Sequence, residues 1–275
     1  MSPDRLEPAA TDAVISRREG AVQVLVNNHP ATRNALSATA YAAMLDALAQ
    51  AQDCPDTGAI VLTGAGDFFC SGGDLNTLAT RRELAPAERR AKLETGLHTL
   101  IRAIRDCSKP VVAAVEGGAA GAGLSLALAC DLLVTTPAAF FSVAYVKVGL
   151  TPDGGATAFL SEFVSRQVLT ELSLTGERID GERLHALGAV NRLADAGRAE
   201  AEAIALAQRI AQGPARAMAR IKTLCRQAHR ASLDAQLDRE AEFMVESQGD
   251  AESAEGIGAF LGKRKADFTA LRRKA

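Results

Sequence analysis

Two glycine-rich loops, each placed directly after a short apolar run, constrain the fold of this 275-residue chain more than any other feature. The first apolar run, residues 59–63, leads into loop 64–75, and the second, residues 111–115, leads into loop 117–123. Short apolar runs bounded by glycine are typical of buried strands, and the apolar residues 124–129 that follow the second loop suit a buried helix. Strands therefore alternate with helices, which predicts an α/β core.

The N-terminal part fits the same class. Residues 14–18 and 21–27 flank Glu19-Gly20, and the second run alternates apolar and polar side chains, which predicts a β-hairpin. Ser37 is the predicted N-cap of a helix that ends before Pro55.

The C-terminal part has a different character. Past residue 198 the chain offers no strand candidate, so we place a boundary near residue 197. Residues 1–197 are predicted to form the α/β core, and residues 198–275 an all-helical region that closes the core or forms a subunit interface. Helices are expected at 156–169, 181–187, 198–212, 214–230, 232–247 and 250–264.

Composition excludes several function classes. The 31 Lys and Arg against 33 Asp and Glu leave a formal charge of −2, so nucleic acid is not the expected partner. The five cysteines form no CxxC pair, so neither a metal site nor a disulfide framework is expected. Residues 1–13 lack a signal-peptide pattern, and the most apolar stretch, 124–134, is too short to cross a bilayer. These features predict a cytoplasmic protein that binds no membrane.

The glycine loops match no common cofactor or nucleophile motif. The second loop lacks the full GxGxxG order, and the chain contains no GxxxxGK[ST], GxSxG or HExxH sequence. What remains is chemistry that needs only backbone N–H groups, which glycines bring close to a ligand. Two such loops facing one another would make an oxyanion hole. Alternatively, both are only tight turns between a strand and a helix.

Several segments in the correct order resemble those of the crotonase (enoyl-CoA hydratase/isomerase) superfamily across nearly the whole chain. The resemblance implies a spiral of β-β-α turns followed by a C-terminal helical trimerisation region, and a homotrimer or dimer of trimers. The segments are 30–36 (PATRNAL), 69–75 (FCSGGDL), 109–123 (KPVVAAVEGGAAGAG), Asp131, 149–155 (GLTPDGG) and 260–264 (FLGKR).

The resemblance also implies an oxyanion hole and an acyl-CoA substrate. In this family two backbone N–H groups bind the thioester oxygen, and these positions fall on Gly73 and Ala122. The second position is commonly glycine, but alanine supplies the same N–H. The neighbours implied to contact the substrate are Ser71, Gly72, Asp74, Leu75 and Gly121.

The two catalytic glutamates of the family's hydratases are absent from this chain. Their positions fall on Ser125, or its immediate neighbourhood, and on Tyr145, which is expected to contact substrate instead. Water addition needs a positioned base and acid, so hydration is disfavoured. Asp153 stands where epoxyphenylacetyl-CoA isomerase and enoyl-CoA isomerase members carry a proton-shuttling aspartate. Alternatively, Asp153 is a helix N-cap.

A dehalogenase of the family uses an aspartate at this position as a nucleophile, together with a histidine and a tryptophan. His98 falls at the histidine position, but the chain has no tryptophan, so this is a third interpretation. His98 is therefore counted among the expected substrate contacts, although it equally suits a partly exposed helix face.

Coenzyme A carries phosphates, and the resemblance implies that Arg33, Phe260 and Lys263 contact it. No cofactor is expected beyond the coenzyme A of the substrate. The sequence therefore predicts an enzyme that stabilises a thioester enolate, with double-bond isomerisation favoured and Asp153 as the proton shuttle. The alternatives are a hydratase with an unusual acid–base set and an acyl-CoA-binding member with weak turnover.

Overall fold

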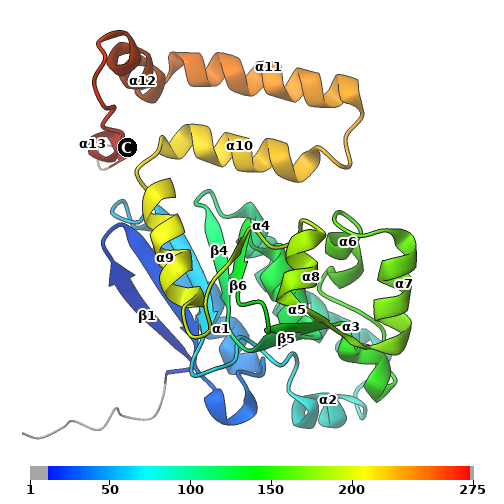
Figure 1. The fold of residues 1–275 in the computed structure, drawn as a ribbon. Coiled ribbons are helices and arrows are strands. Elements are labelled where there is room, and N and C mark those ends of the chain that lie inside the picture. Colours follow the sequence, from blue (N-terminus) through cyan, green and yellow to red (C-terminus); the bar gives the residue numbers. More distant parts are fainter. Residues whose placement is uncertain (1–11, 273–275) are drawn as a thin grey trace, which may run out of the picture.

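The computed structural model describes residues 12–272 (Figure 1). Residues 1–11, most of the stretch considered for a signal peptide, lie outside this range. The chain forms an α/β core, and a layer of C-terminal helices lies on one side of it. The predicted α/β class is confirmed. Within residues 12–272 no helix combines the length and the apolar composition that crossing a bilayer requires.

Two sheets build the core. The larger has the strand order β1-β2-β3-β4-β6-β9, in which β1 and β2 form the predicted antiparallel hairpin and all other neighbours are parallel. The smaller has the order β5-β7-β8. The strands are β1 (Val14–Glu19), β2 (Val22–Asn27), β3 (Ala59–Gly64), β4 (Val111–Val115), β5 (Gly118–Ala120), β6 (Leu132–Thr135), β7 (Phe140–Ser142), β8 (Arg178–Asp180) and β9 (Arg192–Leu193).

The helices cover both faces of the larger sheet and continue beyond it. They are η1 (Pro30–Thr32), α1 (Ala38–Asp53), α2 (Leu75–Arg81), α3 (Pro86–Leu93), η2 (Glu94–His98), α4 (Thr99–Asp106), α5 (Ala122–Ala129), η3 (Ala144–Val148), α6 (Ala156–Leu160), α7 (Arg166–Thr175), α8 (Gly181–Ala186), α9 (Ala199–Ile210), α10 (Ala215–Gln227), α11 (Leu233–Gly249), α12 (Ala251–Leu261) and α13 (Thr269–Arg272).

Strand periodicity divides the core between the two faces of the larger sheet. On one face Leu25, Ile60 and Leu62 pack with apolar residues of α1, α4 and α5. On the other face Val24 and Val61 pack with alanines and a leucine of α9. Because successive side chains of a strand point to opposite faces, continuous apolar strands such as β3 fill both clusters.

Most predicted elements are present, with one clear exception. The predicted cap of α1 is confirmed, since the Ser37 hydroxyl accepts a hydrogen bond from the Ala40 N–H at 3.2 Å. The single helix predicted over 156–169 is wrong, because α6 ends at Leu160 and α7 begins only at Arg166. Ser165 is extended and its hydroxyl accepts from the Val168 N–H, which starts a new helix.

No strand follows residue 198 within the described chain, as expected. The division at residue 197 stays a prediction, and the structure adds a distinction inside the helical region. Helix α9 packs against the larger sheet, whereas α10 and α11 form an antiparallel pair beyond it (Figure 1).

Candidate active site

The two glycine-rich loops lie side by side. Cys70 pairs with Ala119 in an isolated parallel bridge, and the Ala120 N–H donates to the Cys70 carbonyl at 3.0 Å. Gly72 has a φ of +104°, and a Cβ at this position would lie 2.8 Å from the Ala120 oxygen and 3.3 Å from the Ala122 nitrogen. Only glycine therefore permits this approach of the two loops.

Segment 30–36 supports the first loop from its other side. The Leu36 N–H donates to the Gly72 carbonyl at 2.7 Å, and the Asp74 N–H donates to the Leu36 carbonyl at 3.2 Å. The Ser71 hydroxyl donates to the Thr32 carbonyl at 2.9 Å. These bonds use the carbonyl of Gly72 and the N–H of Asp74 but leave the Gly73 N–H between them unused.

The N–H groups of Gly73 and Ala122 have no hydrogen-bond acceptor within residues 12–272. Ala122 is the first residue of α5, where an N–H has no partner inside the helix. Both residues line one cavity of about 550 Å³, together with Ser71, Gly72, Asp74, Leu75, Gly121, Tyr145 and Asp153. Two unpaired N–H groups in the wall of one cavity can bind an oxygen on which negative charge develops.

Asp153 is held in this cavity by two side chains from distant parts of the sequence. The Tyr145 hydroxyl donates to Asp153 Oδ1 at 2.7 Å, and the Ser125 hydroxyl donates to the Asp153 carbonyl at 2.9 Å. Within the described chain, Oδ2 accepts no hydrogen bond. The carboxylate thus has one oxygen that is held in place and one that is available to a ligand.

Asp153 does not cap the helix that follows it. The N-cap of α6 is Gly155, and no side chain donates or accepts at that cap. The Asp153 contact with the helix is made by its backbone, whose carbonyl accepts from the Ala156 N–H at 3.2 Å. The carboxylate therefore has no capping role in this structure.

The tyrosines beside Asp153 remain protonated. Burial raises the pKa of the Tyr145 phenol, and the negative charge of Asp153 raises it further. Burial likewise raises the pKa of Tyr41, which also lines the cavity. Tyr145 is therefore a neutral donor that can support a carboxylate but cannot itself serve as a base near neutral pH.

Asp74 is the other carboxylate in the cavity wall, and its side chain is hydrogen-bonded to residues at the start of α2. Its oxygens accept from the N–H groups of Asn76 and Thr77 at the start of α2 and from the Thr77 hydroxyl at 2.6 Å. The Thr77 hydroxyl, followed by the two N–H groups, lowers the pKa of Asp74. This carboxylate is an N-cap.

Four predicted substrate contacts lie away from the cavity lining. His98 is half-buried in the π-helical turn η2, and Arg33 is exposed with its guanidinium 5.5 Å from the centre of the Phe68 ring. Phe260 and Lys263 lie in the C-terminal layer, and both are exposed. Their roles toward substrate stay predictions.

Sequence analysis did not assign some residues of the lining. Tyr41 and Leu97 line the cavity and also belong to the hydrophobic core. Arg81 lines it as well, from the end of α2. Within residues 12–272 no group of three or more His, Cys, Asp or Glu side chains is arranged to hold a metal ion.

Comparison with known proteins places this geometry in a family. Residues 17–271 match the family model described as enoyl-CoA hydratase/isomerase. The 1,2-epoxyphenylacetyl-CoA isomerase of Escherichia coli is 32% identical over 256 residues, which cover 93% of this chain and 98% of that protein. The 2,3-dehydroadipyl-CoA hydratase of Escherichia coli is 31% identical over 258 residues, which cover 94% and 98%.

A comparison with solved structures leads to the same family. The crystal structure of an enoyl-CoA hydratase from Polaromonas sp. JS666 superposes with a TM-score of 0.89 at 43% identity, covering 92% of this chain and 98% of that one. The family match over residues 17–271 includes both glycine-rich loops and the C-terminal helices. The chain therefore belongs to the enoyl-CoA hydratase/isomerase family, the crotonase superfamily that its glycine loops resemble.

Proposed function

We propose that this protein moves a carbon–carbon double bond within the acyl group of an acyl-CoA thioester. The N–H groups of Gly73 and Ala122 bind the thioester oxygen, and Asp153 carries the proton. The observation that supports this most directly is the Asp153 carboxylate, which lines the same cavity as both N–H groups and keeps one oxygen free of protein partners.

The reaction needs one base that works twice. Asp153 takes a proton from the carbon next to the thioester carbonyl, and the C–H electron pair delocalises onto the thioester oxygen as an enolate. Gly73 and Ala122 stabilise that oxygen with donors that are already in position. The protonated Asp153 then returns the proton to the far carbon of the conjugated system, and the double bond ends one position closer to the carbonyl.

The cavity favours this reaction over water addition. Hydration needs groups that activate water and protonate carbon, yet the two carboxylates of the lining are Asp153 and the capping Asp74. The resemblance places the hydratase acids at or near Ser125 and at Tyr145, and both hydroxyls bond to Asp153. The relative named as an isomerase supports the proposal, while those named as hydratases support the alternative.

The remaining substrate contacts belong to the coenzyme A portion, and the enzyme uses no further cofactor. We place a phosphate of coenzyme A near Arg33, whose guanidinium can form paired hydrogen bonds with phosphate oxygens. Phe260 and Lys263 lie in the C-terminal layer, away from the cavity of their own chain. In a homotrimer or a dimer of trimers they reach the coenzyme A of a neighbouring subunit.

The exposed apolar side chains of α11 and α12 support such an assembly. Leu237, Met244, Ile257 and Phe260 are more than half exposed in the single chain, and burial of such residues drives association. Sedimentation equilibrium tests the assembly directly, and a monomer at all concentrations would contradict it.

The function is tested by Asp153→Asn, which keeps the size of the side chain and removes the base. Turnover of 3-enoyl-CoA thioesters to the 2-enoyl form should fall by at least about 100-fold, while binding of a saturated acyl-CoA stays near its original value. Asp180→Asn is the matched control, since Asp180 caps α8 outside the cavity lining and its loss leaves turnover unchanged.

Three results would contradict the proposal. Unchanged isomerisation by the Asp153→Asn variant would show that another group moves the proton. Efficient hydration of 2-enoyl-CoA by the original protein, without isomerisation, would establish the hydratase alternative. Binding of acyl-CoA with no turnover of either kind would establish a binding role.

A further inference from the structure

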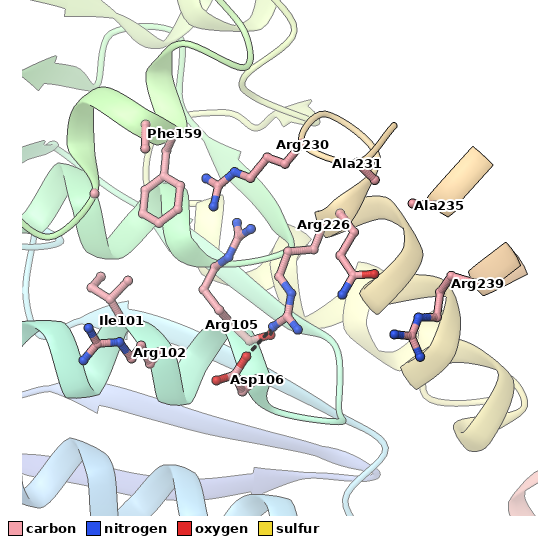
Figure 2. A pocket seen from close by; sticks show the side chains of 13 residues that line it. Ile101, Arg102, Arg105, Asp106, Phe159, Arg226, Arg230, Ala231, Ala235 and Arg239 are labelled. Carbon is pink, nitrogen blue, oxygen red and sulfur yellow. Dashed lines mark hydrogen bonds and ion pairs between the residues drawn. The ribbon is translucent and has the colours of Figure 1, made fainter. Parts of the chain in front are cut away.

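A second cavity, of about 630 Å³, lies between the core and the C-terminal helices (Figure 2). It shares no lining residue with the cavity around Asp153. Ile101 of α4 and Phe159 of α6 form its apolar wall, and Ala235 of α11 faces them from the other side. Its volume is in the range of cavities that hold small molecules.

Arginine dominates the charge of this cavity. Five guanidinium groups stand against a single lining carboxylate, that of Asp106, and Figure 2 shows those of Arg105 and Arg230 directed into the same region beside Phe159. The five groups belong to Arg102 and Arg105 of α4, to Arg226 of α10, to Arg230 in the turn after α10, and to Arg239 of α11. Like charges brought together from three segments repel unless an anion lies between them.

Three of the five arginines have acidic partners. Arg226 pairs with Asp106 at 2.5 Å, Arg230 with Glu162 at 3.3 Å, and Arg239 with Glu242 at 2.7 Å. Arg102 and Arg105 form no ion pair within residues 12–272. The lining therefore carries two guanidinium groups that no carboxylate of the described residues contacts directly.

Of these arginines, Arg105 is the best placed to donate hydrogen bonds to an anion. Its side chain is half-buried, and the guanidinium lies 5.0 Å from the centre of the Phe159 ring, which fixes its position. Burial lowers the pKa of Arg105, the charges of Arg226 and Arg230 lower it further, and Glu162 opposes them. A guanidinium held in a partly dehydrated and positive environment gains more than an exposed one from a bound anion.

We infer that this cavity is a binding site for a small phosphate-bearing dianion, separate from the acyl-CoA cavity. Two guanidinium groups without a direct ion pair match the two charges of a phosphate dianion, and guanidinium groups form paired hydrogen bonds with phosphate oxygens. Because the lining comes from α4, α6, α10 and α11, the bound anion would also hold the C-terminal helices against the core.

Binding is tested with inorganic phosphate as the probe, using titration calorimetry and thermal unfolding of the full chain at constant ionic strength. Phosphate should bind with one site per chain and raise the unfolding temperature, whereas chloride should do neither. Arg105→Gln and Arg102→Gln should each weaken binding at least about 10-fold. Arg209→Gln, an exposed arginine of α9 outside the cavity, is the matched control and should bind as the original protein does.

Each other outcome overturns the inference. Equal phosphate binding by the original protein and both cavity variants would mean adventitious binding. Loss of binding in Arg33→Gln but not in Arg105→Gln would place the anion at the position proposed for a phosphate of coenzyme A. If phosphate does not bind and Arg105→Gln lowers the sedimented mass, the cavity instead receives acidic side chains of a second copy. Arg102 is exposed, so its variant remains informative if Arg105→Gln fails to fold.

Discussion

Helices α9 and α10 follow one another in the chain and yet pack in different ways. In α9, Ala199, Ala203, Leu206 and Ala207 are buried against the larger sheet. In α10 no residue is buried, although the helix is of similar length. The first helix belongs to the core, and the second begins a layer that gains little from apolar burial within its own chain.

Polar contacts hold that second layer in place. Lys222 of α10 pairs with Asp131 at 2.7 Å and donates to the carbonyls of Ile104 and Lys109. Glu252 of α12 accepts hydrogen bonds from the backbone N–H groups of Arg216 and Ala217 and so caps the start of α10. The core is thus stabilised mainly by burial, and the C-terminal layer mainly by directed polar contacts.

The largest expected effect separates a core residue from a layer residue. Leu100 of α4 is fully buried, so Leu100→Ala should lower the free energy of unfolding by about 2–5 kcal/mol. Leu237→Ala, at a side chain that is 52% exposed, should change the free energy of unfolding by no more than about 0.5 kcal/mol at low protein concentration. Urea unfolding measures both. Similar losses for the two variants would show that α11 has a buried face.

A smaller effect concerns the polar attachment of α10. Lys222→Met leaves the Asp131 carboxylate beside apolar groups without its cation, which should cost about 1–3 kcal/mol. This cost is lower than for a fully buried pair, because 25% of the Asp131 side chain is exposed to solvent. Hydrogen exchange should accelerate in α10 more than in β4. Adding Asp131→Asn removes the unpaired charge and should recover part of the loss.

If exchange instead accelerates equally in α10 and β4, the layer and the core open as one unit. That result would remove the distinction between the two regions.

The smallest effect is a pH dependence confined to the end of the layer. The Arg264 guanidinium, with the Asp267 N–H, lowers the pKa of Glu255 from 4.5 to about 2. A carboxylate with a depressed pKa stabilises the folded form fully above pH 4.5, and the contribution disappears as the pH falls toward 2. The protection factor of the Asp267 amide, which donates to Glu255 at 2.8 Å, should therefore fall as the pH is lowered over this range.

Glu255→Gln should lower the protection factor of the Asp267 amide at pH 6 and remove the dependence of that protection on pH between 4.5 and 2. Core amides such as those of β3 should not respond. An equal response in β3 would mean that acid acts on the whole molecule.

Local patterns predicted most of the elements. The hairpin of β1 and β2, the Ser37 cap and the strands before both glycine loops follow from side-chain periodicity and turn residues within a few positions. The break between α6 and α7 was missed. Serine occurs at helix caps and also, less favourably, inside helices, and only the extended backbone of Ser165 decides between the two.

The composition of the candidate site was predictable in part. Gly73, Ala122 and Asp153 were assigned from their motifs, and the structure brings all three to one cavity. The hydroxyls that hold Asp153 were not assigned to that task, since Ser125 and Tyr145 are 28 and 8 positions away from it. No local pattern reports a hydrogen bond over such separations.

The sequence by itself determined which segments form strands and helices, and where glycine allows two loops to meet. These properties depend on backbone preferences and on the spacing of apolar side chains, which neighbouring residues set. The tertiary structure alone decided that Asp153 accepts from Tyr145 instead of capping α6, and that arginines of α4, α10 and α11 share one cavity. Both depend on the packing of segments far apart in the chain, where burial and charge act through space.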